Sequence, residues 1–114
     1  MTLVTDESCN WCRAGVEPND GWRAAEPAGE RRAVFCRLEH VAPWVMRGAR
    51  WDAGTLTEPR DLAASLTECA LCGEPLPDSY VLLVRHRGDH RIPDVFCSAD
   101  HMGQWAKQGG RWAP

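Results

Sequence analysis

One spacing of cysteines and histidines occurs twice in this chain. The first copy reads C-x2-C-x23-C-x3-H and the second reads C-x2-C-x24-C-x3-H. The residues are Cys9, Cys12, Cys36 and His40 in the first copy and Cys69, Cys72, Cys97 and His101 in the second. Three thiolates and one imidazole are the donor set of a closed, tetrahedral structural zinc site. The sequence therefore predicts two Zn²⁺ ions per chain.

The duplication continues beyond these residues. Both copies share the text F-C-x3-H-x3-W-x3-G-x-R-W, which aligns Trp44 with Trp105 and Trp51 with Trp112. A repeated unit of roughly 50–60 residues is the simplest explanation. A unit of that size has a marginal hydrophobic core, and a metal ion commonly supplies the missing stability.

Disulfides, a redox C-x-x-C site and an iron–sulfur cluster are the alternatives to zinc. A redox C-x-x-C is not expected to occur twice, each time followed by C-x3-H, and the fourth ligand is a histidine in both copies. Residues 1–9 lack the basic and apolar pattern of a secretory signal, and no apolar run approaches the ~18 residues of a membrane span. We therefore expect a cytoplasmic protein, away from the membrane, whose thiols stay reduced and available to zinc.

Each copy predicts the same order of elements: a knuckle around the first cysteine pair, a hairpin and a helix. The first hairpin is expected from strands at 21–23 and 31–35, and the second from strands at 80–85 and 92–96 with a turn at Gly88 and Asp89. A helix follows, because C-x3-H places its two ligands on one helical face. Ser98 is expected to cap the second helix, whereas Pro43 should kink the first helix or delay its regular part.

These elements predict a small, metal-stabilised α+β protein. The expected domains are a first finger at 1–52, a connector with a short helix at 53–68 and a second finger at 69–114. The short connector and the shared tryptophans favour packing of the two fingers into one body. Trp44 and Trp105, one turn beyond the histidines, are expected to shield the metal from water.

The second copy resembles the TRASH and FCS-type treble-clef zinc fingers. The resemblance rests on C-A-L-C-G-E-P-L at 69–76 and V-F-C-S-A-D-H at 95–101, and extends more loosely to residues 9–44, where Arg37 replaces the serine. It implies two tandem treble-clef fingers. Such fingers handle metals or bind proteins and nucleic acids, and a shared fold does not decide between these functions.

A non-enzymatic adaptor that binds a protein partner is the first functional hypothesis. Trp11 lies between two ligands at the tip of the first knuckle, where its side chain is expected to point outward as an interface anchor. The alternative is that Trp11 packs on the other repeat. The oligomeric state is left open, with a monomer as one option.

Nucleic-acid binding by a basic hairpin tip is the second hypothesis. Arg85, Arg87 and Arg91 would carry it, and nearby tryptophans could stack on bases. The formal charge of −3, which six thiolates and two Zn²⁺ would take to −5, argues against it, since proteins that bind phosphates usually carry a positive surplus.

Two more specific functions, a nuclease and a metal sensor or chaperone, have less support than the two hypotheses above. Residues 89–93 faintly resemble the D-H-I-x-P stretch of HNH nucleases, but a closed Cys3His site lacks the open position that catalytic zinc needs. A metal sensor or chaperone would need an exchangeable site. A third metal site at His86 and His90 is not expected, because a two-residue turn sends these side chains to opposite faces.

Overall fold

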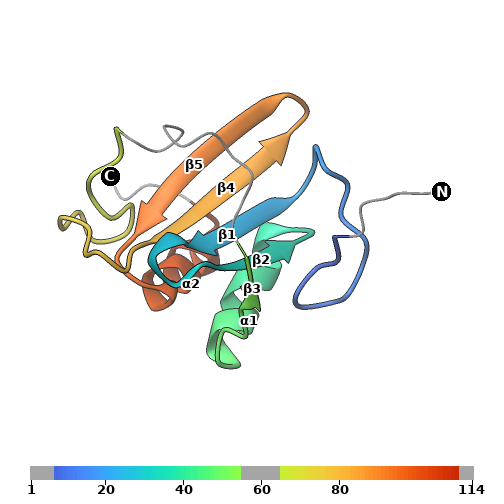
Figure 1. Cartoon of the computed structure of the whole chain (residues 1–114), viewed down its shortest axis with the longest axis horizontal. Helices are drawn as coiled ribbons and strands as arrows, with labels where there is room; N and C mark the ends of the chain where they lie inside the picture. The colour runs from blue at the N-terminus through green and yellow to red at the C-terminus, as the bar shows by residue number, and fades with distance from the viewer. Residues whose placement is uncertain (1–6, 55–64, 111–114) are drawn as a thin grey trace.

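A single antiparallel sheet joins the two repeats in the computed structural model, which describes residues 7–54 and 65–110. The strand order is β3-β2-β1-β4-β5, so each hairpin occupies one half of the sheet (Figure 1). The strands are β1 (Trp22–Glu26), β2 (Arg31–Phe35), β3 (Asp52–Ala53), β4 (Val81–Arg87) and β5 (His90–Phe96). The helices are η1 (Pro27–Gly29) and η2 (Leu38–His40), both 3-10, and α1 (Val41–Met46) and α2 (Ala99–Lys107). The result is a small α+β protein.

The central strand pair relates the two repeats by a local two-fold axis. Ala24 of β1 lies opposite Leu83 of β4. These two residues are equivalent in the repeats, because each follows by two positions the residue that pairs with the repeat's phenylalanine, Phe35 or Phe96. The register is symmetric about this pair, since Arg23 pairs with Val84 and Ala25 pairs with Leu82. Backbone pairing between the repeats therefore makes one continuous sheet out of two short hairpins. The predicted division at 1–52, 53–68 and 69–114 remains a prediction.

Both predicted hairpins form; β2 has the predicted bounds, and the other three strands are longer than expected. β1 continues to Glu26, because it is a central strand bonded to β2 on one side and to β4 on the other. β4 and β5 run right up to the predicted turn at Gly88 and Asp89, and Arg87 pairs with His90. The short helix expected in the connector falls largely on residues 55–64, which lie outside the described residues. Trp112 also lies outside them.

The two helices begin differently, for reasons visible in the sequence. Ser98 caps α2, where its hydroxyl oxygen accepts a hydrogen bond from the backbone N–H of His101 at 3.2 Å. Arg37 occupies the corresponding place in the first repeat and makes no side-chain cap. A 3-10 turn forms there instead, and α1 starts only at Val41, so that Pro43 falls within its first turn. Proline lacks a backbone N–H, and the N–H groups of the first turn have no acceptor within the helix. The late start of α1 therefore accommodates Pro43.

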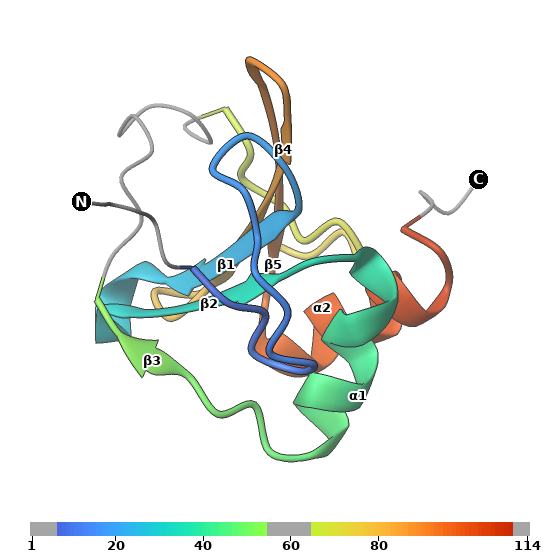
Figure 2. The same ribbon diagram turned by 90° about the vertical axis from the view of Figure 1, so that its right-hand side faces the viewer.

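The core lies between the sheet and the two helices, which pack side by side on one face (Figure 2). Phe35 is the last residue of β2 and Phe96 is the last residue of β5, and both are fully buried. Trp44 of α1 packs edge-on against Phe35 at 5.1 Å between ring centroids, and Trp105 of α2 lies 5.2 Å from Phe96. The duplicated aromatic residues therefore build equivalent halves of one core.

The opposite face of the sheet is covered near β1 by residues 7–21. Arg23 is almost fully buried and donates hydrogen bonds to Glu7 and to the carbonyl oxygens of Glu17 and Asp20. Glu7 also pairs with Arg32. A buried guanidinium needs such partners, because an unpaired charge away from water is strongly unfavourable. The corresponding strand position in the second repeat holds Leu82, so this network is peculiar to the first repeat.

The two helices approach each other closely at Gly103. A Cβ atom at this position would lie 3.1–3.2 Å from three side-chain carbons of Val45 on α1. We predict that Gly103→Leu pushes α1 and α2 apart and destabilises the protein by about 1–3 kcal/mol, the usual cost of overpacking. Gln104→Leu is the control, because Gln104 is exposed on the same helix. Thermal unfolding measures both; equal stability of the two variants would contradict tight helix contact at Gly103.

Candidate metal centres

Each repeat gathers its four predicted ligands into one cluster. The donor atoms of Cys9, Cys12, Cys36 and His40 all lie within 4.8 Å of one another, and so do those of Cys69, Cys72, Cys97 and His101. In each case the first two cysteines come from the knuckle, the third follows the last strand of the hairpin, and the histidine lies at the start of the helix. The structure therefore brings together residues up to 32 positions apart, and each cluster could hold a metal ion.

The distances within the clusters match a tetrahedral ion of the size of zinc. Zn–S bonds of about 2.3 Å and a Zn–N bond of about 2.0–2.1 Å imply S···S edges of about 3.8 Å and S···N edges of about 3.6 Å. Cys12 Sγ lies 3.6 Å from Cys36 Sγ, and His40 Nδ1 lies 3.5 Å from Cys9 Sγ. The second cluster repeats both distances, with 3.6 Å between Cys72 and Cys97 and 3.5 Å between Cys69 and His101. The Nδ1 atom faces the sulfurs in both.

The knuckles orient backbone N–H groups towards the first sulfur. The amides of Trp11 and Cys12 donate to Cys9 Sγ at 3.4 Å and 3.5 Å. The chain then reverses through a left-handed residue, which is Gly73 at φ 76° in the second knuckle and Arg13 at φ 71° in the first. Glycine adopts this conformation without steric strain, whereas arginine does so at a cost of about 1–2 kcal/mol.

The two buried knuckle thiols favour the thiolate form. Burial by itself would raise the pKa of Cys9, but N–H donors from Cys12, Cys36 and Trp11 outweigh it and lower the pKa to about 6. Cys69 behaves in the same way, and its pKa is also lowered to about 6. Hydrogen bonds to a charged form stabilise that form. Each knuckle therefore presents one sulfur that is ready to bind a cation at neutral pH.

The third cysteine of each cluster shows the opposite tendency. Burial, together with the neighbouring sulfurs Cys12 and Cys9, raises the pKa of Cys36 to about 11. The equivalent effects raise the pKa of Cys97 to about 12. Several thiolates cannot ionise side by side without a compensating positive charge. A bound dication would supply that charge.

The duplicated tryptophans lie in the core beside the clusters. Trp44 and Trp105 are each about 3% exposed, and each packs on the phenylalanine that directly precedes the third cysteine. Their indole Nε1 atoms are buried without a hydrogen-bond partner among the described residues. Trp51 packs edge-on against Trp44 at 5.0 Å and extends this cluster in the first repeat.

The residues predicted to bind a partner have different environments. Trp11 is 37% exposed, and the Arg47 guanidinium lies 5.9 Å from its ring centroid. This cation–π contact joins two residues of the first repeat. Arg85 and Arg87 are exposed on one face of β4. Arg91 lies on the other face, where it donates to the carbonyls of Gly88 and His90 and to Asn19 Oδ1. The three arginines therefore do not form one continuous patch.

The two remaining histidines lie on opposite faces of the β4–β5 hairpin, as the turn length predicts. His86 is buried, and its Nδ1 donates to the Pro18 carbonyl at 2.8 Å. His90 is exposed at the end of β5. The structure thus does not bring this pair together. Buried Arg23 was not among the predicted site residues; its ionisable side chain in a short strand between Trp22 and Ala24 was the available signal.

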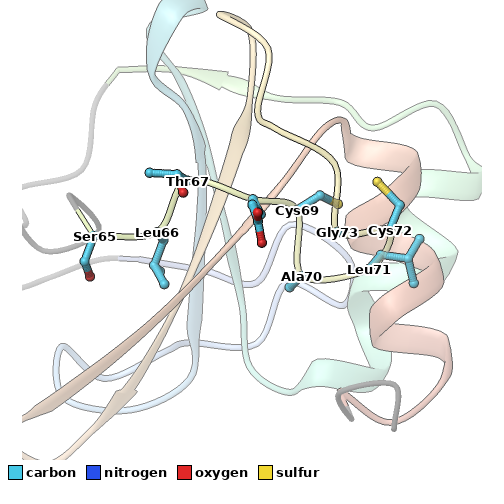
Figure 3. Close-up of a pocket in the computed structure, with 9 residues that line it drawn as sticks. Ser65, Leu66, Thr67, Cys69, Ala70, Leu71, Cys72 and Gly73 are labelled. Atoms are coloured by element: carbon cyan, nitrogen blue, oxygen red, sulfur yellow. The ribbon is translucent and has the colours of Figure 1, made fainter.

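A hollow lies along the second knuckle and is lined by residues 65–73. Figure 3 shows the Cys69 and Cys72 side chains at one end of it and Ser65, Leu66 and Thr67 at the other.

None of the helices in the described part of the chain has the length and apolar character that crossing a lipid bilayer requires. Comparison with protein-family models, with curated proteins and with solved structures found no match.

Acid should release the metal from both clusters in a defined pH range. In the metal-free clusters the pKa of Cys9 and of Cys69 is lowered to about 6, so one thiolate per cluster is already formed above that pH, whereas below it protons compete with the metal for this sulfur. We predict that metal retained after dialysis is nearly constant from pH 8 to 7 and falls steeply below about 6. Full retention at pH 4.5 would contradict thiolate ligation. Elemental analysis of the dialysed protein provides the measurement.

Proposed function

We propose that this chain is a non-enzymatic zinc protein made of two treble-clef fingers, each closed around one structural Zn²⁺. The observation that carries the proposal is the convergence of three thiols and one imidazole in each repeat, at distances that suit a tetrahedral ion. Knuckle, hairpin and ligand-bearing helix follow one another in both repeats, which is the treble-clef order. The sulfur-rich donor set favours zinc over magnesium or calcium, which prefer oxygen ligands.

A structural role for the zinc is supported by the saturated donor set. Four protein ligands leave no open position for water or substrate, and catalytic zinc sites keep such a position. Each ion would tie a knuckle, a strand end and a helix start together. Structural zinc contributes an apparent ~10–16 kcal/mol in small fingers, which is comparable to or larger than the ~5–15 kcal/mol net stability of a whole domain.

Zinc content and folding should therefore be inseparable. We predict close to two Zn²⁺ per chain by elemental analysis and loss of the folded circular dichroism spectrum when a strong chelator is added. Cys36→Ser and Cys97→Ser should each retain about one ion and unfold at least their own repeat. Ser8→Ala, next to the first cluster but outside its donor set, is the control and should keep both ions. A folded spectrum that survives complete removal of zinc would overturn the structural role.

The adaptor part of the proposal rests on the surface around the first knuckle. Trp11 is 37% exposed, and Met46, at the end of α1, is 77% exposed. The Arg47 guanidinium lies 5.9 Å from the Trp11 ring centroid, and the exposed Met46 directly precedes Arg47 in the chain. Tryptophan, methionine and arginine are enriched at protein interfaces. We assign the capture of a protein partner to this Trp11 surface, which comprises Trp11, Met46 and Arg47.

Removal of the Trp11 ring should separate binding from folding. Trp11→Ala should leave zinc content and melting temperature nearly unchanged, because the ring is partly exposed, while weakening partner binding about 30-fold or more, as expected for an interface anchor. Leu71→Ala, the equivalent knuckle position in the second repeat, is the matched control. Affinity capture from the producing cell, followed by titration with the captured protein, provides the measurement. Equal partner binding by both variants would refute the Trp11 surface.

Nucleic-acid binding is the second candidate, supported by the exposure of Arg85 and Arg87 on one face of β4. Arg91 adds less, because its guanidinium already bonds to the hairpin and to Asn19. The acidic total charge of −3 makes tight phosphate-backbone binding unfavourable. Salt-dependent binding that is tighter than about 10⁻⁶ M and lost on Arg85→Ala would favour this candidate over the adaptor.

A further inference from the structure

A cleft of about 360 Å³ lies where the end of β4 and the segment after β2 flank the start of β1. This volume is near the lower end of the roughly 300–1,000 Å³ typical of small-ligand sites. The lining comes from three stretches of chain, residues 20–22, 36–39 and 85–87. Both repeats contribute, so the cleft exists only because their hairpins share one sheet.

Three arginines line this cleft without a carboxylate partner. Arg85 and Arg87 come from β4 on one side of β1, and Arg37 comes from the extended segment after β2 on the other side. All three are exposed, and within residues 7–54 and 65–110 no carboxylate lies within ion-pair distance of any of them. Other strand arginines are neutralised, since Arg23 and Arg31 pair with Glu7 and Glu26. The cleft therefore carries a net positive charge in an acidic protein, since its three arginines outnumber the two carboxylates of its lining, Asp20 and Glu39.

The floor of the cleft is held in place by backbone contacts. Gly21 lies at φ 77°, and a Cβ atom there would come within 2.7 Å of the Phe35 carbonyl oxygen. The His86 amide donates to the Gly21 carbonyl at 2.8 Å, and the buried Arg23 donates to the Asp20 carbonyl. Glycine at this position lets the end of β2 and the Val16 side chain approach the start of β1 closely. The three arginines are thus presented by a fixed backbone rather than by a loose loop.

The remaining walls offer an aromatic ring and hydrogen-bond acceptors. Trp22 is half-buried, and the Arg85 guanidinium lies 5.3 Å from its ring centroid. Asp20 and Glu39 are exposed in the lining, and Asp20 uses one carboxylate oxygen to accept the Gly21 N–H at 2.9 Å. The second Asp20 oxygen and the Glu39 carboxylate can accept from hydroxyl or amino groups. These carboxylates also disfavour a ligand that is anionic throughout.

We propose that this cleft binds a small phosphate monoester whose remaining part carries hydroxyl groups and a ring, such as a sugar phosphate or a nucleoside monophosphate. Three guanidinium groups on both sides of β1 suit a dianion with three terminal oxygens, whereas a carboxylate occupies a single guanidinium fork. Asp20 and Glu39 accept from the hydroxyl groups, and the ring packs against Trp22. This site is separate from the Trp11 surface and does not depend on the adaptor role.

Calorimetric titration of the zinc-loaded full chain tests the proposal. The probes are ribose 5-phosphate and adenosine monophosphate, with ribose, adenosine and citrate as comparisons lacking a phosphate. Both phosphate monoesters should bind with one site per chain, and each of Arg37→Gln, Arg85→Gln and Arg87→Gln should weaken binding about tenfold or more, as expected for one charge-assisted hydrogen bond. Arg47→Gln, an exposed arginine on the Trp11 surface, is the matched control and should bind normally.

Each other outcome overturns the assignment. If citrate binds as tightly as the phosphate monoesters, the cleft is a site for any anion. If oligonucleotides bind and the monoesters do not, the arginines serve nucleic-acid recognition instead. No binding by millimolar ligand, or equal weakening by Arg47→Gln, would also refute it. Zinc content and circular dichroism check that each variant is folded. Should Arg85→Gln unfold through loss of its contact with Trp22, Arg37→Gln and Arg87→Gln still decide.

Discussion

Three sulfur atoms and one ring nitrogen lie within 4.8 Å of one another in each repeat, and such a group is electrostatically unfavourable as free thiolates. Burial together with this repulsion raises the pKa of Cys36 and Cys97, whereas knuckle amides lower the pKa of Cys9 and Cys69 and so stabilise one charge per cluster. A divalent cation resolves the conflict. Such a cation would tie the knuckle, the strand end and the helix start together, in addition to hydrogen bonds such as the one from the Asn10 amide to the Val34 carbonyl at 2.7 Å.

The continuous sheet is the second constraint. Neither hairpin would be stable alone in water, since a two-stranded hairpin is marginal at best. Pairing of β1 with β4 gives each hairpin a neighbour, and packing of α1 on α2 closes the core over one face. The two-fold register at Ala24 and Leu83 lets equivalent residues meet, so that a duplicated sequence can fold into one body with two equivalent Cys3His clusters.

The departures from symmetry are where the functional proposals lie. The first repeat has Trp11 where the second has Leu71, and an arginine network around Arg23 where the second has Leu82. The second repeat has the longer hairpin, whose Arg85 and Arg87 reach past β1. Metal ligands and core aromatics are duplicated because both halves need the same support. The Arg23 network is buried and supports the first repeat, whereas the exposed residues that differ, Trp11, Arg85 and Arg87, carry the proposals for recognition of other molecules.

The sequence by itself determined the two donor sets, the hairpins, the Ser98 cap and the delay that goes with Pro43. These features follow from local spacing, turn chemistry and capping, which act over a few residues. Only the tertiary structure decided that β1 pairs with β4, that Gly103 meets Val45 and that Arg91 bonds to Asn19 while Arg85 and Arg87 stay exposed. It also created the cleft around Trp22. Contacts between residues distant in the chain depend on how the two repeats pack, and the spacing within one repeat carries no information about that packing.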